Sequence, residues 1–201
     1  DTPNGKKISI MLEEIKFEYK VTKINILNDE QFKPEFKKLS PFSKIPVIID
    51  HEANISLFES GAILIYLGEK SGKFYDKTQR TIINQWLMGQ MSYVGPMLGQ
   101  HHQFHHYNRG KSEFGENRYF KISQRIYKEL NQRLSHSDFL AGKKYTIADI
   151  ATFPWIARHE WHDIGLKNYS NLMRWYNEIS KRKAVQKGYD LLNRGDEIPK
   201  V

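Results

Sequence analysis

The sequence contains no cysteine among its 201 residues. This absence excludes disulfide bonds, thiolate metal sites and cysteine nucleophiles, and it is typical of proteins from a reducing compartment. We therefore expect a cytoplasmic protein. Any thiol chemistry that the protein performs must use a thiol bound from solution.

Long apolar runs are lacking as well. No uninterrupted stretch is long enough to cross a bilayer, and no segment resembles a secretory signal, so we expect no membrane partner. Hydrophobic residues still make up 39% of the chain, which is enough to bury a sizeable core at this length. The composition predicts a soluble globular protein of one or two domains.

A basic stripe with interleaved aromatic residues is also missing. The formal net charge is +8 and attracts anions, yet lysine and arginine are scattered among acidic residues. This distribution favours a solvated surface that draws in small anions, and we expect no nucleic-acid partner.

The chain has no initiator methionine and enters a helical pattern almost at once. Thr2 suits a helix cap and Pro3 the first helical turn. We expect that a first strand is absent from the sequence as given. The apolar positions that follow have the spacing of one buried helix face: Ile8, Met11, Leu12 and Ile15.

Mixed α and β signals continue to about residue 73. The alternation from Tyr19 to Ile26 predicts a strand, Pro34 to Leu39 a short helix, and residues 44–50 with 55–58 a β-hairpin. A further helix is expected from Ser60 to about Lys70, closed by Gly72. The order of elements indicates a small α/β domain over residues 1–73.

Only helical signals follow the polar linker at residues 76–80, so we expect an all-α domain over residues 78–201. One helix runs from Thr78 past Gln90 and should kink at Gly95-Pro96, because proline lacks the amide donor. Another spans residues 113–134. Thr146-Ile147-Ala148-Asp149 has the form of a helix-capping box, and the last clear helix contains Leu172, Trp175, Tyr176 and Ile179.

Five motifs occur in one order along nearly the whole chain. They are Thr2-Pro3-Asn4-Gly5, Lys44-Ile45-Pro46, Phe58-Glu59-Ser60-Gly61-Ala62-Ile63, Gly95-Pro96-Met97-Leu98-Gly99-Gln100 and Thr146-Ile147-Ala148-Asp149. Together they resemble glutathione transferases, and more narrowly the bacterial nu class, whose members act as glutathione-dependent disulfide-bond oxidoreductases. The resemblance implies a thioredoxin-like domain followed by a helical domain, assembled as a homodimer.

Glu59 and Ser60 lie where a strand meets a helix, and a helix N-terminus accepts anions. The resemblance implies that Ser60 binds the γ-glutamyl carboxylate of glutathione and that Glu59 binds its ammonium group. An ordinary helix cap is the alternative.

Pro46 stands where a strand should begin, which is tolerated at a sheet edge or as a cis bond. The amide and carbonyl of Ile45 could then pair with the cysteinyl backbone of the tripeptide, although its side chain could simply be core. Lys44 could neutralise a ligand carboxylate, and Gln31 matches a family position near the glycyl end. For Gln31 and Lys44 a solvated surface position is the alternative.

Thr2 and Asn4 stand where other classes place a residue that activates the sulfur, and the resemblance implies that they donate hydrogen bonds to it. Otherwise Thr2 caps the helix and Asn4 faces solvent. Arg118 matches a residue that the family presents across the dimer interface to the partner's ligand. A solvated helix surface is the alternative for Arg118.

Without a protein thiol, the redox reaction must use glutathione itself. We expect a glutathione thiolate to attack a disulfide or peroxide, and a second glutathione to resolve the adduct. Two alternatives remain, namely glutathione conjugation to electrophiles and a non-catalytic glutathione-binding protein of the same fold.

The histidines and tryptophans are not assigned a role in this glutathione chemistry. His101 with His105 and His102 with His106 form i, i+4 pairs, but they point in different directions and no acidic partner completes a zinc site. We expect no metal; the resemblance implies that these positions line the cleft between the domains, where the histidines could contact the second substrate. Trp86, Trp155, Trp161 and Trp175 are interpreted as core or interface residues.

Overall fold

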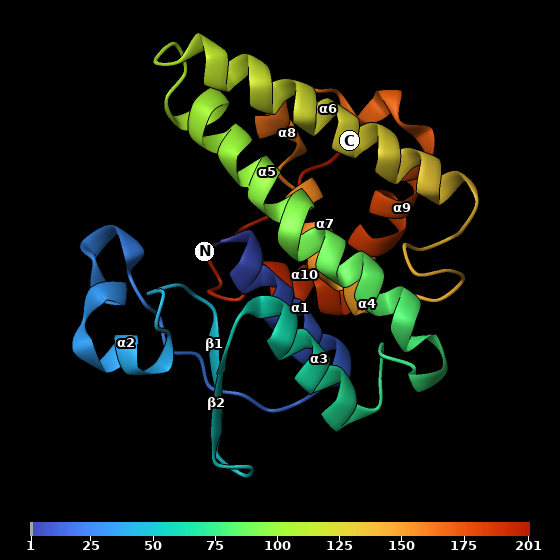
Figure 1. Cartoon of the computed structure of the whole chain (residues 1–201). Helices are drawn as coiled ribbons and strands as arrows, with labels where there is room; N and C mark the ends of the chain where they lie inside the picture. The colour runs from blue at the N-terminus through green and yellow to red at the C-terminus, as the bar shows by residue number, and fades with distance from the viewer. Residues whose placement is uncertain (1) are drawn as a thin grey trace.

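The computed structural model describes residues 2–201, and Asp1 lies outside the described residues. Its N-terminal part combines helices with a β-hairpin, and helices alone follow it (Figure 1). This arrangement confirms the predicted fold class. The N-terminal elements are α1 (Pro3–Ile15), α2 (Pro34–Leu39), β1 (Val47–Asp50), β2 (Ile55–Phe58) and α3 (Ser60–Ser71).

The first helix begins at the expected cap. The Thr2 hydroxyl accepts a hydrogen bond from the Gly5 amide at 3.1 Å, and Pro3 occupies the first turn. Residues 6–11 are nevertheless all buried, because α1 is packed between α3, α7 and α10. The sequence pattern predicted one apolar face, whereas the fold also buries the polar side chains of Lys6, Lys7 and Ser9.

The strand predicted from Tyr19 to Ile26 is wrong. Residues 17–25 form no regular element, and short 3₁₀ helices follow at Ile26–Asn28 and Glu30–Phe32. An alternating segment becomes a strand only when a second strand pairs with its backbone. The sheet within residues 2–201 contains β1 and β2 alone, and Val21 remains 41% exposed.

The predicted hairpin and the following helix are confirmed. β1 and β2 are antiparallel, with Val47 opposite Phe58. Helix α3 ends at Ser71 and is capped by Gly72, whose φ of 67° lies in the left-handed region that glycine adopts at low cost. Asp50 of β1 accepts a hydrogen bond from the Tyr66 hydroxyl of α3 at 2.7 Å, which ties the hairpin to this helix.

The helical part begins after a 3₁₀ turn at Lys77–Gln79. None of the helices in residues 2–201 is both long enough and apolar enough to cross a membrane. The α-helices of the helical part are α4 (Arg80–Gly89), α5 (Gly95–His101), α6 (Glu113–Ser135), α7 (Ile147–Ile156), α8 (His159–His162), α9 (Ser170–Ser180) and α10 (Lys183–Tyr189); π-helical turns lie at Gln90–Val94 and His102–Tyr107, and a 3₁₀ turn at Leu166–Asn168.

The break expected at Gly95-Pro96 takes the form of a π-helical turn. The amide of Gly95 donates to the carbonyl of Gln90, five residues back, and Pro96 then occupies the first turn of α5. The wider turn accommodates a residue that has no amide donor.

Helix α7 is the centre of the helical part and packs on α1, α3 and α4. Its capping box is present as predicted. Asp149 is fully buried, and it accepts hydrogen bonds from Thr146, from the Leu140 amide and from the Trp175 indole. The sequence motif thus fixes a helix start that also organises the surrounding core.

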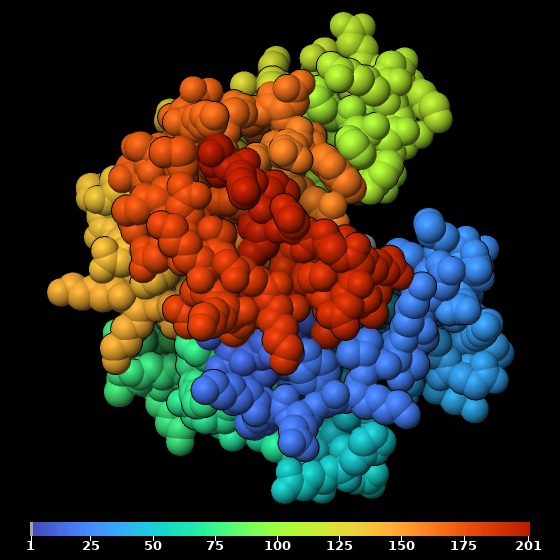
Figure 2. All heavy atoms as spheres, turned by 180° about the vertical axis from the view of Figure 1, so that it is seen from behind, coloured from blue at the N-terminus to red at the C-terminus, as the bar shows by residue number. Residues whose placement is uncertain are grey.

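Helix α10 was not predicted. It packs on α1, and the Ser9 hydroxyl donates to the Gly188 carbonyl at 2.5 Å. Viewed from behind, the C-terminal residues lie directly against the N-terminal ones (Figure 2). The two ends of the chain therefore hold each other in place.

Candidate functional site

The start of α1 carries two polar side chains that were predicted to contact a sulfur atom. Because the Thr2 hydroxyl accepts from Gly5, its own proton can be donated elsewhere. Capping and donation are therefore compatible at this residue. The first turn of α1 also adds the positive end of a helix dipole.

Asn4 does not simply face solvent. Its side-chain oxygen accepts a hydrogen bond from the indole nitrogen of Trp155 in α7, at 3.1 Å. This contact leaves the NH₂ group of Asn4 as a donor with a fixed direction. Trp155 was interpreted as a core residue and is indeed buried, but nothing in its sequence context indicated that it orients Asn4.

The start of α3 has a strained backbone and no side-chain cap. Glu59 has φ 67° and ψ 111°, values that residues with a Cβ rarely adopt, and its exposed side chain makes no capping hydrogen bond. The ordinary-cap alternative is therefore wrong. The first amides of a 12-residue helix remain available to an anion.

Ser60 is the first residue of α3 and is 3% exposed. Its hydroxyl oxygen lies 3.2 Å from the ammonium nitrogen of Lys7, which reaches it from α1. Lys7 was not predicted as a site residue. Its position three residues after Asn4 and four before Met11 places it on the same helix face as both, which is the available sequence signal.

The cis bond between Ile45 and Pro46 is present, as was allowed for in the sequence. Since Val47 pairs with Phe58, Pro46 and Glu59 are neighbours at one end of the hairpin. No hydrogen bond within residues 2–201 occupies the amide or the carbonyl of Ile45. The backbone of Ile45 can therefore accept an extended ligand as a strand would.

Gln31 and Lys44 differ in their surroundings. Gln31 is buried, so the surface alternative is wrong for this residue; its NH₂ group donates to the Ile26 carbonyl at 3.3 Å while its oxygen has no partner. Lys44 is exposed. Both lie in the segment before β1, on the α2 side of the hairpin.

Within this chain, Arg118 does not lie near the other predicted site residues. It is exposed in the second turn of α6, with its guanidinium 6.0 Å from the Tyr119 ring. The start of α6 lies at the opposite end of the molecule from α3 (Figure 1).

Three histidines, His101, His102 and His162, form a buried cluster, so the position at the cleft that the resemblance implied is wrong for His101 and His102. Both rings are buried. The Nε2 atoms of His102 and His162 are 2.8 Å apart, and Nδ1 of His162 is 2.6 Å from the Tyr127 hydroxyl. Burial lowers the pKa of His101 to about 4 and that of His102 to about 3, so the cluster is neutral at pH 7.

This cluster abuts the candidate site. The ring of His102 stacks on Trp155, with centroids 5.9 Å apart, and Trp155 in turn holds Asn4. No group of three potential metal ligands occurs in the described part of the chain.

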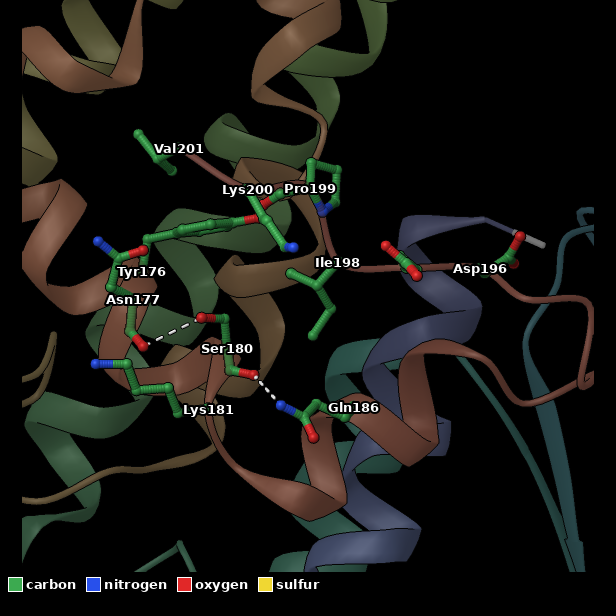
Figure 3. A pocket seen from close by; sticks show the side chains of 11 residues that line it. Tyr176, Asn177, Ser180, Lys181, Gln186, Asp196, Ile198, Pro199, Lys200 and Val201 are labelled. Carbon is green, nitrogen blue, oxygen red and sulfur yellow. Dashed lines mark hydrogen bonds between the residues drawn. The ribbon is translucent and has the colours of Figure 1, made fainter.

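Surface hollows occur at several places. An open notch separates the α5–α6 end of the helical part from the segment that precedes β1 (Figure 2). A different hollow of about 560 Å³ lies between α9, α10 and the C-terminal segment, and is lined by Tyr176, Lys181 and Ile198 among others (Figure 3). This second hollow contains none of the predicted site residues.

Taken together, the geometry offers hydroxyl and amide donors at the start of α1 and an anion site at the start of α3. An unpaired backbone edge at Ile45 lies beside the anion site. Such an arrangement suits an extended, anionic peptide that carries a thiol.

The chain matches two family models. One is described as the N-terminal domain of glutathione S-transferase and covers residues 1–69; the other is described as its C-terminal domain and covers residues 103–183. Disulfide-bond oxidoreductase YfcG of Escherichia coli (strain K12) is 41% identical, over 98% of this chain and 94% of its own length.

Two solved structures are similar over most of the chain. A glutathione transferase from Burkholderia graminis, with two glutathione molecules bound per subunit, has a TM-score of 0.90 at 37% identity and covers 96% of this chain and 86% of its own. One from Pseudomonas putida, with one glutathione disulfide bound per subunit, has a TM-score of 0.87 at 40% identity, with coverage of 93% and 86%.

Proposed function

Because the chain belongs to the glutathione S-transferase family, we propose that it is a glutathione-dependent disulfide-bond oxidoreductase. The observation that carries this proposal is the oriented donor group of Asn4 in a chain without cysteine. The name of the relative YfcG and the glutathione disulfide bound in the Pseudomonas putida structure support it.

Glutathione would bind as an extended peptide along the N-terminal part. Ser60 and the first amides of α3 hold the γ-glutamyl carboxylate, and the exposed carboxylate of Glu59 binds the ammonium group. Ile45, ahead of the cis Pro46, pairs with the cysteinyl backbone. Gln31 and Lys44 recognise the glycyl end.

Thr2 and Asn4 would stabilise the thiolate. Lowering a thiol pKa by about two units requires about 2.7 kcal/mol of preference for the charged form, which one or two hydrogen bonds to a charged acceptor can supply. The N-terminus of α1 adds to this preference.

The reaction then proceeds in two exchanges. A glutathione thiolate attacks one sulfur of the substrate disulfide; that S–S bond breaks, a mixed disulfide forms, and the other substrate sulfur leaves as a thiolate that takes a proton. A second glutathione thiolate attacks the glutathione sulfur of the mixed disulfide. Glutathione disulfide forms, the second substrate thiol leaves, and the two electrons lost by two glutathiones reduce the substrate. A peroxide could replace the disulfide as oxidant.

We further propose a cytoplasmic homodimer with domains at residues 1–73 and 78–201. Arg118 is exposed near the start of α6, and this end of α6 lies far from α3 of the same chain (Figure 1), which supports a role at the partner's ligand. The site would then be complete only in the dimer.

The first test compares glutathione-dependent reduction of hydroxyethyl disulfide with conjugation of a chlorodinitrobenzene-type electrophile. We expect strong reduction and weak conjugation. The reverse would make the protein a conjugating transferase. Absence of both, with glutathione still bound, would make it a non-catalytic binding protein.

Variants of Asn4 test the sulfur contact. Asn4→Asp keeps the acceptor for Trp155 but removes the donor and adds a negative charge beside the thiolate. We expect turnover to fall about 100-fold or more, because one charge-assisted hydrogen bond contributes about 1.5–3 kcal/mol and repulsion adds to its loss. Full turnover in Asn4→Asp, measured with hydroxyethyl disulfide, would remove Asn4 from the mechanism.

A further inference from the structure

Lys7 is a buried lysine whose surroundings contain no paired carboxylate. It lies in the second turn of α1 and is 1% exposed. Its ammonium nitrogen is 2.7 Å from the side-chain oxygen of Gln90 and 3.2 Å from the Ser60 hydroxyl. A third contact, at 3.4 Å, is to the sulfur of Met91, a weak acceptor.

These partners leave the positive charge uncompensated. Lys7 forms no ion pair within the described residues, and the π-helical turn presents only the neutral Gln90 and Met91 to it. The titratable group that faces it is Glu59, whose effect on the pKa is smaller than that of burial. Burying an ammonium group costs desolvation free energy, which is offset only when an opposite charge lies beside it.

The residue that accepts from Lys7 has an unsatisfied atom of its own. The side-chain nitrogen of Gln90, which is 1% exposed, has no hydrogen-bond partner. A buried donor without a partner is rare in folded proteins. The start of α3 thus combines uncapped amides with a buried ammonium group that has no ion-pair partner within the described residues.

Ser60 connects Lys7 to the site. Because the ammonium group donates to the Ser60 oxygen, the hydroxyl proton must point elsewhere, and its present contact is the Met91 sulfur at 3.6 Å. A carboxylate oxygen at the α3 N-terminus would be a much stronger acceptor. Lys7 and Ser60 would then form a donor chain that ends on the ligand.

We infer that Lys7 is a positioning residue for glutathione, which directs the Ser60 hydroxyl toward the γ-glutamyl carboxylate and supplies the buried counter-charge for it. This inference rests on the proposed function and extends it to a group that contacts the ligand only through Ser60. It couples the protonation of Lys7 to binding.

The coupling has a defined sign. Burial lowers the pKa of Lys7 to about 7, so the unliganded protein is only partly protonated there at neutral pH. A bound carboxylate favours the ammonium form and raises this pKa. Binding therefore takes up a proton near pH 7–8, and the affinity decreases as the pH rises above about 7.

The test uses S-methylglutathione, whose blocked thiol cannot titrate, and isothermal titration calorimetry in two buffers of different ionisation enthalpy. For the wild type we expect net proton uptake at pH 7.5. Lys7→Met should lose this uptake and bind about tenfold or more weakly at pH 6.5, the effect of losing one charge-assisted interaction. The ammonium group of the ligand titrates equally in both proteins and cancels in the difference.

Lys6→Met is the matched control. Lys6 is the neighbouring buried lysine on α1, but it faces α10, where it contacts the Tyr189 carbonyl and Asp196. The control should change thermal stability without changing proton uptake or affinity. Circular dichroism at 25 °C verifies that both variants are folded.

The outcomes separate this inference from the proposed function. If the wild type does not bind S-methylglutathione, the proposed function fails at the binding step. If it binds, and folded Lys7→Met shows the same affinity and the same proton uptake, the role of Lys7 is wrong while glutathione binding stands. An equal loss of uptake in Lys6→Met would also overturn the inference.

Discussion

At the scale of single residues, the candidate site depends on side chains buried behind it. Trp155 directs the amide of Asn4, and Lys7 directs the hydroxyl of Ser60. Neither was identified from the sequence as a site residue, because a tryptophan or a lysine in a helix can equally belong to the core, an interface or the surface. Only the contacts across α1, α3 and α7 distinguish these two.

Glu59 presents a conflict between backbone strain and binding. With φ 67° and ψ 111°, a residue with a Cβ is strained by about 1–3 kcal/mol, and such strain is concentrated at functional sites. We predict that Glu59→Gly raises the free energy of unfolding by about 1 kcal/mol, since glycine relieves the strain but adds entropy to the unfolded chain. Denaturant unfolding measures this change.

The same substitution should weaken glutathione binding, because the carboxylate for the ligand ammonium is lost. Glu59→Ala is the control: it removes the carboxylate equally but keeps the Cβ, so it should bind as weakly without the gain in stability. Equal stability of the two variants would show that the backbone at this position is not strained.

At the scale of elements, α10 was missed because its sequence carries a weak apolar pattern and a glycine. Its buried residues are Val185, Gly188 and Tyr189. Glycine lowers helix propensity, yet here it allows two helices to approach closely. A Cβ on Gly188 would lie 2.6 Å from the backbone of Ile10 in α1.

We therefore predict that Gly188→Ala destabilises the protein by about 2 kcal/mol or more, because the backbone of α1 cannot move aside without disturbing the core. Thermal and denaturant unfolding report the change. Gly89→Ala in α4 is the matched control, since a Cβ there meets nothing within 4 Å, and it should be neutral or stabilising by up to about 1 kcal/mol. A Gly188→Ala protein as stable as the wild type would contradict the close packing of α1 and α10.

The remaining elements show where local signals suffice. The Thr146–Asp149 box, the hairpin and the short helix at Pro34–Leu39 were predicted closely, because caps, turns and prolines act over a few residues. The segment from Tyr19 to Ile26 had a strand pattern but no pairing partner within residues 2–201. Strand formation is a property of two segments, and one segment cannot determine it.

At the scale of the whole molecule, a continuous core joins the two parts of the chain, since α1 and α3 pack on α7. His101, His102 and His162 are buried beside this core, and the His102 ring stacks on Trp155. Protonation of these histidines at low pH should therefore destabilise the core and the candidate site together. A histidine that is neutral when folded binds a proton near pH 6.5 when unfolded.

The free energy of unfolding should thus decrease as the pH falls below about 6.5. In this range the histidines of the unfolded chain bind protons, whereas the folded protein keeps His101 neutral down to about pH 4 and His102 down to about pH 3. We expect a slope of about 1 kcal/mol or more per pH unit between pH 6.5 and 5. His102→Gln should flatten this slope in thermal unfolding. His51→Gln, at an exposed turn position, should leave it unchanged, and an unchanged slope in His102→Gln would refute the role of the cluster.

The sequence by itself determined the hairpin, the helix starts at Thr2 and Thr146 and the set of glutathione-type motifs. These depend on residues close together in the chain, or on a resemblance that spans it. The tertiary structure alone decided that Lys7 lies under Ser60, that Trp155 orients Asn4 and that α10 supports α1. Those relations join residues as much as 179 positions apart. Periodicity along one segment holds no information about which distant segment will cover it.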